Sequence, residues 1–597
     1  MLKSTFVLSF SSFLLFATAT DISDLVFGNL DDAIPAAYGD FNSDELTDVF
    51  VMRDNFRTVE ILLGSDIDHL LQSSSLKCKY SNRITSVVPG DFDGDAFMDM
   101  MVTVDLGDDK IGVYINYGGS SHLNCTEPDA APYVTMRGEP LALDYNYDMI
   151  IDLFGMDLEG QRTFWIFENS RNIPTNITMS HGDRKLSKLT IPHSHAVLDL
   201  NDDFAADLFL TAEDNNVEIW LASDNDKHQR FEYNRTIKYS PPGSDNKHYG
   251  QSIFLDMELI GSLNQLMPVC HDRKCLNSTI WVQTGEHYHD LNINFYQDDN
   301  KTLWGFLVPE HKEFYSKAIT LRTGDFNNDG FPDLLVTLQK NGGSTIQTFL
   351  MENVKDVNAK PTDHFKRTFA VRWNALLPFG DNTVMGSFYD FYQDGILDVI
   401  LLQKNGDRYK PLAFRNTLDY DANFVKVIVL TGLTNSLPPA KETAFGTKKR
   451  NYGTNLPGPR IKYTTTTQEG TPQNGGSCQL PQSAYFSLHL PYTIFGLGRT
   501  PNFVDFIEIG LSKQSRKWPQ TIPNSQIFVI PAPLDQPAIW KIQLFVTPSK
   551  IILKSVFALL GICFVIMLII VGLHLKERRQ DKLEKLQEAQ RFHFDAM

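Results

Sequence analysis

Short apolar runs rich in β-branched and aromatic residues recur along the chain, and each of them follows a short polar segment. VFVM at 49–52 and MMV at 100–102 are two examples. Runs of this length, bounded by Gly, Asn and Asp, predict strands, and segments with the 3.6-residue spacing of a helix are scarce among them. The pattern therefore predicts an all-β protein over most of its length.

A shorter apolar run lies at the beginning of the chain. Lys3, the uncharged residues 6–16 and the Ala-Thr-Ala at 17–19 follow one another in the order of a basic, an apolar and a cleavage region. This is the organisation of a secretory signal peptide, and the apolar run is too short to span a bilayer. We expect residues 1–19 to be removed.

A longer apolar run lies near the end of the chain. Residues 555–575 carry no charged side chain, and as a helix they would extend roughly 31 Å, which matches a bilayer core. Lys576, Arg578 and Arg579 follow at once, so the positive-inside rule places the tail at 576–597 in the cytoplasm. The sequence thus predicts a single-pass type I protein of the cell membrane with an extracellular N-terminal part.

The polar segments before the predicted strands are copies of one pattern, with Asp or Asn at relative positions 1, 3, 5 and 9. The first copies begin at intervals of 51, 53 and 55 residues. The side chains at these positions in the six copies are Asp40, Asn42, Asp44 and Asp48; Asp91, Asp93, Asp95 and Asp99; Asp144, Asn146, Asp148 and Asp152; Asp199, Asn201, Asp203 and Asp207; Asp325, Asn327, Asp329 and Asp333; and Asp390, Asp394 and Asp398, with Tyr392 at position 3 of the last.

The repeat predicts the architecture. A degenerate copy at Asp256 fills the long interval between the fourth and fifth of these, which gives seven units of about 50 to 70 residues. Repeats of that length with several short strands predict a seven-bladed β-propeller, and a solenoid of the same units is the alternative. We expect the propeller at 20–436.

Oxygen-bearing side chains at alternate positions of a tight loop converge on one point. A backbone carbonyl at position 7 and the carboxylate at position 9 would complete an oxygen-only shell, which suits several structural Ca²⁺ ions. The carbonyls belong to Leu46, Phe97, Ile150, Ala205, Phe331 and Ile396. An EF-hand is excluded, because the Glu at position 12 is missing and strands follow the loops. Gly, which commonly serves position 6, occurs there only in Gly330 and Gly395.

The composition agrees with a secreted or surface protein. Lys and Arg number 54 against 72 Asp and Glu, a formal net charge of −18 that argues against nucleic-acid binding. Five glycosylation sequons precede the predicted membrane span, at Asn124, Asn176, Asn234, Asn277 and Asn300. Cys270 and Cys275 could close a short disulfide loop, and Cys78 with Cys125 is the simplest second pair, which leaves Cys478 unassigned.

Catalytic motifs are scarce. His193 with His195, and His287 with His289, could begin a zinc site, but no third ligand can be named for either pair. No nucleophile elbow, phosphate loop or HExxH helix occurs in the sequence. We therefore do not expect an enzyme.

The acidic units resemble the FG-GAP repeats of integrin α-subunit propellers, as GDFNNDGFPD at 324–333 illustrates. Over essentially its full length the chain also resembles the T-cell immunomodulatory protein, or linkin, family. QEAQRFHFDAM at 587–597, IPNSQ at 522–526 and NFVD at 502–505 carry that resemblance. It implies a calcium-binding extracellular propeller with a part in cell adhesion or in modulating immune cells.

The segment after the propeller, 437–554, begins with a stretch rich in Pro, Gly and Thr and continues with β-patterned runs. It predicts a small membrane-proximal β-sandwich that acts as a stalk. In the tail, Leu583, Leu586 and Phe594 could form a helix for a cytosolic partner, or the basic residues could contact anionic lipid.

Together these features predict a cell-surface adhesion or interaction receptor whose propeller binds an extracellular protein or a receptor on another cell. A shed, secreted ectodomain that acts as an immunomodulatory ligand is one alternative, and a carbohydrate-binding propeller is another.

Overall fold

The structure is a computed structural model of the whole chain. The predicted signal peptide and Asn300 lie outside the residues that it describes. These are 20–182, 185–223, 230–239, 247–297, 301–309, 317–360, 364–376, 382–417, 422–435, 451–467, 470–483, 488–499, 503–546 and 550–594. Within these ranges the chain divides into one unit up to Phe545 and a second from Val546 onward.

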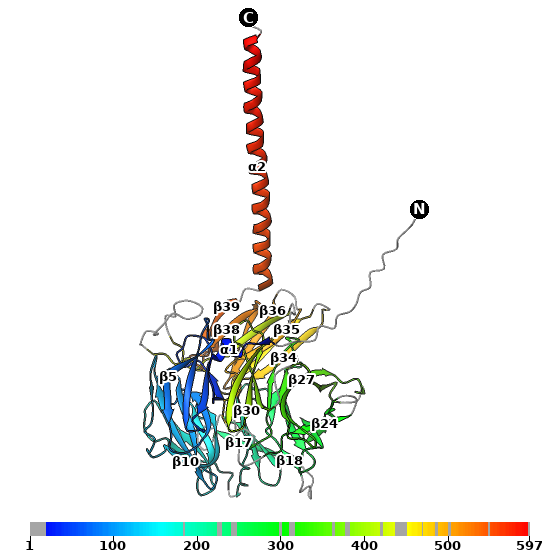
Figure 1. Cartoon of the computed structure of the whole chain (residues 1–597). Coiled ribbons are helices and arrows are strands. Elements are labelled where there is room, and N and C mark those ends of the chain that lie inside the picture. Colours follow the sequence, from blue (N-terminus) through cyan, green and yellow to red (C-terminus); the bar gives the residue numbers. More distant parts are fainter. Residues whose placement is uncertain are drawn as a thin grey trace. The chain divides into compact units, whose positions relative to one another are not determined.

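The strands before residue 416 form six sheets in the described part of the chain, arranged as Figure 1 shows. One sheet has eight strands, because 134–137 pair with 110–113, and dividing it at this pairing gives seven consecutive antiparallel groups, which is compatible with the seven predicted blades. The groups are β2 (Ile34–Gly39), β3 (Asp48–Arg53), β4 (Thr58–Gly64) and β5 (Leu71–Lys79); β6 (Ile84–Gly90), β7 (Asp99–Gly107), β8 (Lys110–Gly118) and β9 (Leu123–Asn124); β10 (Val134–Leu143), β11 (Asp152–Met156), β12 (Arg162–Ile166) and β13 (Thr175–Thr178); β14 (Ala196–Leu198), β15 (Asp207–Ala212), β16 (Asn216–Ala222) and β17 (Phe231–Lys238); β18 (His248–Tyr249), β19 (Ile253–Leu255), β20 (Asn264–Cys270), β21 (Ser278–Thr284) and β22 (His287–Asp290); β23 (Tyr296–Gln297), β24 (Thr302–Phe306), β25 (Leu321–Gly324), β26 (Asp333–Lys340), β27 (Ile346–Lys355) and β28 (Arg367–Arg372); and β29 (Thr383–Tyr389), β30 (Asp398–Asn405) and β31 (Arg408–Arg415).

The hydrophobic pattern of a strand follows its place in the blade. The second strands β3 and β15 are buried along almost their whole length, because a neighbouring blade covers each face of their sheet. The outer strands β5 and β17 instead mix buried and exposed positions. The apolar runs seen in the sequence are therefore the inner parts of the blades.

The ring closes between the first and last blades. β1 (Thr20–Asp21) pairs with β31 and adds an outer strand to the last blade, just before the short helix α1 (Ser23–Phe27). Farther in, the Tyr38 hydroxyl lies 2.5 Å from Ser387 Oγ, and the Tyr38 and Tyr389 rings are in contact. Residues from both ends of the propeller sequence thus share one hydrophobic core.

Two four-stranded sheets follow the propeller and form a β-sandwich. One sheet has the order β35 (Thr493–Gly498), β32 (Asn423–Val429), β38 (Ser525–Ile530), β39 (Lys541–Val546). The other has the order β34 (Pro472–Cys478), β33 (Arg460–Thr466), β36 (Val504–Leu511), β37 (Gln514–Thr521), and the short 3-10 helix η2 (Pro537–Ile539) precedes β39.

β32 lies before the domain boundary that the sequence placed after residue 436. It pairs with β38 in parallel and with β35 in antiparallel, so it belongs to the sandwich. Its apolar run does not differ from that of a blade strand, and the pattern alone could not assign its sheet.

The second unit contains helix α2 (Lys550–Phe594). Its segment Ser555–Glu588 is long and apolar enough to cross a membrane, and it is the one helix of that kind in the described chain. The run at 555–575 is therefore a candidate transmembrane helix.

Candidate metal-binding loops

The acidic repeats are the loops between the first and second strands of the blades. We number them by blade: loop 1 (40–48), loop 2 (91–99), loop 3 (144–152), loop 4 (199–207), loop 5 (256–264), loop 6 (325–333) and loop 7 (390–398). Position 9 is in every case the first residue of the second strand. The predicted ligands of each loop thus lie together at one end of a blade.

The side chain at position 9 stabilises the loop by accepting backbone hydrogen bonds. In loop 2, Asp99 Oδ2 accepts the backbone N–H of Phe92 (2.9 Å), and Oδ1 accepts that of Gly118 on the third strand (2.7 Å). The bond from position 2 recurs in all seven loops. The bond from the third strand recurs in all except loop 5, where Asn264 replaces Asp.

The carboxylate at position 1 closes the turn. It accepts the backbone N–H of position 6 in all seven loops, at 2.8 Å from Ala96 to Asp91 Oδ2 in loop 2. Positions 4 and 6 both have positive φ throughout. Glu45, Ala96, Met149 and Phe204, with φ between 65° and 72°, therefore adopt the conformation for which Gly is preferred. The missing glycines do not change the loop.

Charge is concentrated and buried in these loops. Burial above all, with the negative charges of neighbouring loop carboxylates, raises the pKa of Asp91 and Asp144 to about 7. The same causes raise the pKa of Asp152 and Asp325 to about 8. Such carboxylates ionise at neutral pH only at a cost in free energy, unless a cation lies beside them.

The oxygen atoms converge most closely in loop 2. Ligand atoms of Asp91, Asp93 and Asp99 lie within 4.8 Å of one another, the one group of this kind found among the described residues. In loops 1, 3, 4 and 6 the Asn at position 3 instead donates its amide to the carboxylate at position 5. In loop 3, the buried Asp144 Oδ1 has no hydrogen-bond partner.

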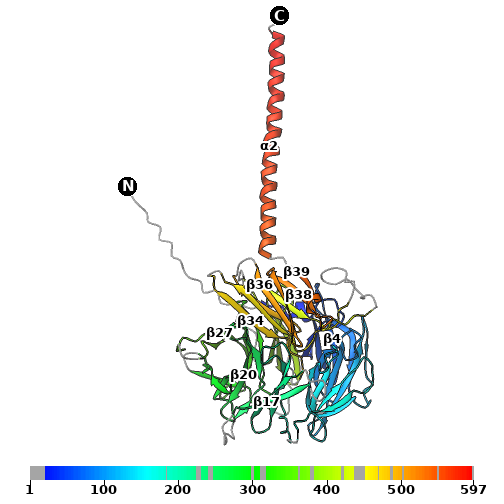
Figure 2. The same ribbon diagram turned by 180° about the vertical axis from the view of Figure 1, so that it is seen from behind.

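The sandwich covers this end of the propeller, as the yellow and orange strands in Figures 1 and 2 show. Polar groups of the sandwich and of its connecting segments bind the loops directly. Asn451 Nδ2 donates to Ala96 O (2.6 Å), Gly496 N to Asp325 Oδ2 (3.1 Å), and Gly476 N to Asp256 Oδ2 (3.1 Å).

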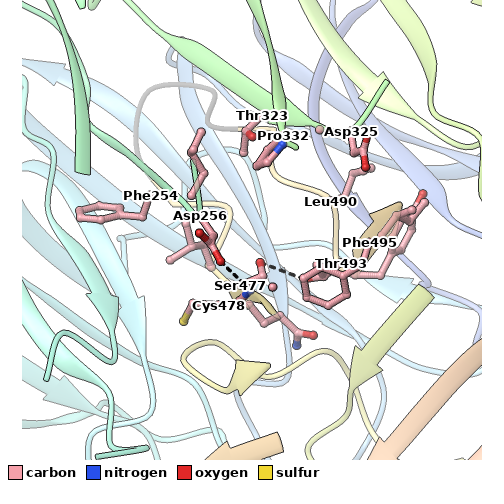
Figure 3. Close-up of a pocket in the computed structure, with 18 of the residues that line it drawn as sticks. Phe254, Asp256, Thr323, Asp325, Pro332, Ser477, Cys478, Leu490, Thr493 and Phe495 are labelled. Atoms are coloured by element: carbon pink, nitrogen blue, oxygen red, sulfur yellow. Dashed lines mark hydrogen bonds between the residues drawn. The ribbon is translucent and has the colours of Figure 1, made fainter. Parts of the chain in front are cut away.

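A cavity of about 120 Å³ remains between the two domains. In Figure 3, Asp256 and Asp325 line it from the loops, and Ser477 and Phe495 line it from the sandwich. The segment predicted as a stalk is therefore packed on the acidic loops, which no feature of the repeat itself indicates.

The predicted cysteines and sequon residues are placed as follows, with Cys478 lining the cavity between the loops and the sandwich. Cys78 forms a disulfide with Cys125 and Cys270 with Cys275, while the Cys478 thiol is buried and free. The sequon residues Asn124, Asn176, Asn234 and Asn277 are exposed.

The histidine pairs form no three-ligand group within the described residues. His193 and His195 stack at 4.0 Å between ring centroids, and His193 Nε2 lies 2.7 Å from Glu139 O. His193 is buried and His195 is half-buried in the propeller, and burial lowers the pKa of His193 to about 4.

A propeller of acidic repeats with an added β-sandwich defines an FG-GAP-repeat protein. The family of the FG-GAP-like repeat matches residues 40–102, and the family described as "ITFG1, C2 domain" matches residues 451–545. The second match lies within the sandwich.

The full-length relatives agree with this class. The chain is 38% identical to the human T-cell immunomodulatory protein (Homo sapiens), covering 94% of this chain and 92% of that one, and 37% identical to the mouse protein (Mus musculus) over the same shares. It is 26% identical to protein linkin of Caenorhabditis elegans, covering 94% and 95%. The chain belongs to the T-cell immunomodulatory protein family, as the sequence motifs indicated.

Proposed function

We propose that this chain is a calcium-binding cell-surface receptor that uses its extracellular propeller for adhesion or for modulating immune cells. The names of its relatives support the immunomodulatory part of this role, and the candidate transmembrane helix supports a membrane location. The fold and the family names favour a receptor over an enzyme.

The observation that carries the proposal is the set of buried carboxylates in loops that keep one backbone conformation. The donors at positions 1, 3, 5 and 9 are all oxygen atoms, which is the donor set for Ca²⁺. The unpartnered Asp144 Oδ1 and the convergent oxygens of Asp91, Asp93 and Asp99 fit a cation at these points. In the loops with Asn at position 3, rotation of the amide would turn its oxygen toward the ion.

Calcium would have a structural role. The ion supplies the positive charge that holds mutually repelling carboxylates together, while the loop residues hold the blade ends in register. At a free calcium concentration of 100 times Kd, each occupied site adds about 2.7 kcal/mol to the free energy of unfolding. Several sites together would dominate the stability of the propeller.

Thermal unfolding of the full-length protein in detergent tests this role. We expect excess EGTA to lower the melting temperature and added Ca²⁺ to restore it, whereas Mg²⁺ at the same concentration restores little. An unchanged transition in EGTA would overturn the calcium proposal.

The partner would bind the end of the propeller opposite the loops, because the sandwich occupies the loop end. The turn between β3 and β4 exposes Asp54 and Asn55 there, and the turn between β7 and β8 exposes Asp108 and Asp109. Cells that display this protein should therefore no longer bind cells that carry its partner when a glycan is introduced at the β7–β8 turn. A glycan introduced on the sandwich strand β37 is the control, and equal loss from both would contradict this choice of face.

The orientation in the membrane can be tested separately. If the propeller is extracellular, a peptide-N-glycosidase should increase the gel mobility of the protein, and each Asn→Gln change at Asn124, Asn176, Asn234, Asn277 or Asn300 that removes a glycan should do so partly. Protease added to intact cells should spare only the helix and tail. Protection of the propeller would contradict the type I orientation.

A further inference from the structure

Loop 7 keeps the hydrogen bonds to the carboxylates at positions 1 and 9, which we call the frame of the loop. It does not keep the full set of candidate ligands. Asp398 accepts the N–H groups of Phe391 and Asn416, and Asp390 accepts that of Gly395 at 3.2 Å. Position 3, however, is Tyr392, whose ring lies under the Arg415 guanidinium at 4.2 Å. The loop therefore has three carboxylates and lacks the oxygen ligand at position 3.

The side chain of a lysine from the sandwich extends into this loop. Lys426 belongs to β32, its side chain is only 2% exposed, and its Nζ lies 3.5 Å from Asp390 Oδ2. The same Nζ lies 3.9 Å from the centre of the Tyr492 ring. A buried ammonium group is stable only beside a compensating charge, and the carboxylates of loop 7 supply it.

Loop 6 provides the comparison within the molecule. It has all four oxygen-bearing side chains, and the sandwich group at its position 1 is the neutral backbone N–H of Gly496, 3.1 Å from Asp325 Oδ2. At loop 6 the sandwich thus brings a neutral donor to the carboxylate at position 1. At loop 7 it brings a positive charge to the same position, which would repel a divalent ion a few ångströms away.

Loop 5 also lies beside a sandwich cation. It has Asp256, Glu258 and Asn264 at positions 1, 3 and 9 of the pattern, but Ile260 at position 5. The buried Arg460 of β33 donates to Gly261 O at position 6 of this loop, and its charge lowers the pKa of Asp256 against the effect of burial. Arg460 also lies 3.5 Å from Asp202 in loop 4, which is not a ligand position, whereas the buried Lys426 contacts a carboxylate at position 1. In loop 2, Arg171 of the propeller contacts Asp93, but its side chain is half-exposed.

We propose that Lys426 is the resident cation of loop 7, so that this loop takes no calcium ion and ties the sandwich to the propeller independently of calcium. The count of ions rests on the proposed function: loops 1, 2, 3, 4 and 6 bind one Ca²⁺ each, and the protein binds five. The sequence alone, which placed ligands at Asp390, Asp394, Ile396 and Asp398, would predict six.

The first experiment counts bound calcium per full-length chain in detergent after dialysis against buffered Ca²⁺. We expect five ions in the wild type and six in Lys426→Met, in which an uncharged side chain of similar length leaves the loop 7 carboxylates without a cation. Lys462→Met is the matched control and should keep five, because Lys462 pairs with Asp202 (2.8 Å) at position 4 of loop 4, which is not a ligand position. Six ions in the wild type, or five in Lys426→Met, would overturn the proposal.

The second experiment needs no calcium and separates this inference from the proposed function. In EGTA, Asp390→Asn should lower the melting temperature of the wild type, because it leaves Lys426 buried without its partner. The same change should have at most a third of that effect in the Lys426→Met background. Equal effects in both backgrounds would show that the pair does not exist, whether or not the other loops bind calcium.

Discussion

Loops 2 and 5 have the same backbone but different side chains. In both, position 6 donates to the carboxylate at position 1, position 2 donates to the side chain at position 9, and positions 4 and 6 have positive φ. Loop 2 has Asp at positions 3 and 5, whereas loop 5 has Glu258 and Ile260. The comparison indicates that positions 1 and 9 fix the loop backbone whether or not the other candidate ligands are present, whereas positions 3 and 5 contribute to the candidate ligand set alone.

The largest effect of a single substitution should come from removing the carboxylate at position 9. Asp99→Ala leaves the buried N–H groups of Phe92 and Gly118 without acceptors, at about 1 to 3 kcal/mol each, so the free energy of unfolding should fall by about 4 kcal/mol. The loss should appear in urea unfolding both with calcium and with EGTA. Asn264→Ala in loop 5 breaks one such bond and should cost less than half as much; equal losses would contradict the assignment.

The next effect is a dependence on pH that changes sign with calcium. Without metal, the pKa of Asp91 (about 7) and of Asp152 (about 8) lies above the unfolded value, so the folded state holds more protons. The free energy of unfolding should therefore fall as the pH rises from 4, by about 1.4 kcal/mol per pH unit for each such group until the pH reaches the pKa of that group in the folded state. With saturating calcium it should rise over that range, because protons compete with the ion. Melting temperatures of metal-free and calcium-loaded protein check this.

A smaller effect separates the metal from the frame. Asp95→Asn keeps an oxygen that can accept the Phe97 N–H, now 2.9 Å from Asp95 Oδ1, but removes a ligand charge. We expect little change in EGTA and a loss of about 1.4 kcal/mol in calcium, equivalent to tenfold weaker binding in that loop. A calcium-independent loss would assign Asp95 to the frame.

The smallest expected effects come from two opposite substitutions at position 6, one that removes a side chain and one that adds a side chain. Ala96 and Gly261 have φ values of 70° and 83°. Ala96→Gly should raise the free energy of unfolding by about 1 kcal/mol, and Gly261→Ala should lower it by about as much, because a side chain is strained there. A Cβ at Gly261 would meet only the Asn474 Cβ, at 3.8 Å, so a loss much greater than this would point to an unseen contact.

The sequence predicted the structure best at positions where a single residue type has a single structural role. The Asp at positions 1 and 9 and the runs that follow them predicted the loops, the strands and the all-β class. Position 6 was less informative, because the bond from its N–H to the position 1 carboxylate holds the left-handed backbone even at Phe204, with φ 65°. A local hydrogen bond thus stabilises positive φ at position 6, so the glycine expected there is not required.

Contacts between the domains could not be predicted in this way. Lys426 lies in a strand whose pattern resembles that of a blade, and Asn451 and Gly496 lie in segments without a repeat to compare. Their roles follow from which sheet each segment joins and where that sheet packs. These are long-range properties that hydrophobic spacing does not encode.

The pairing of β1 with β31 also sets an order for biosynthesis. Thr20 pairs with Arg415, so the first described strand can pair only after residues nearly four hundred positions later have been made. At typical synthesis rates this delay is roughly 20 to 80 s. During this delay the nascent ring stays open with an unpaired strand edge. Chaperone dependence and retention of truncated chains are thus expected consequences of a two-residue strand.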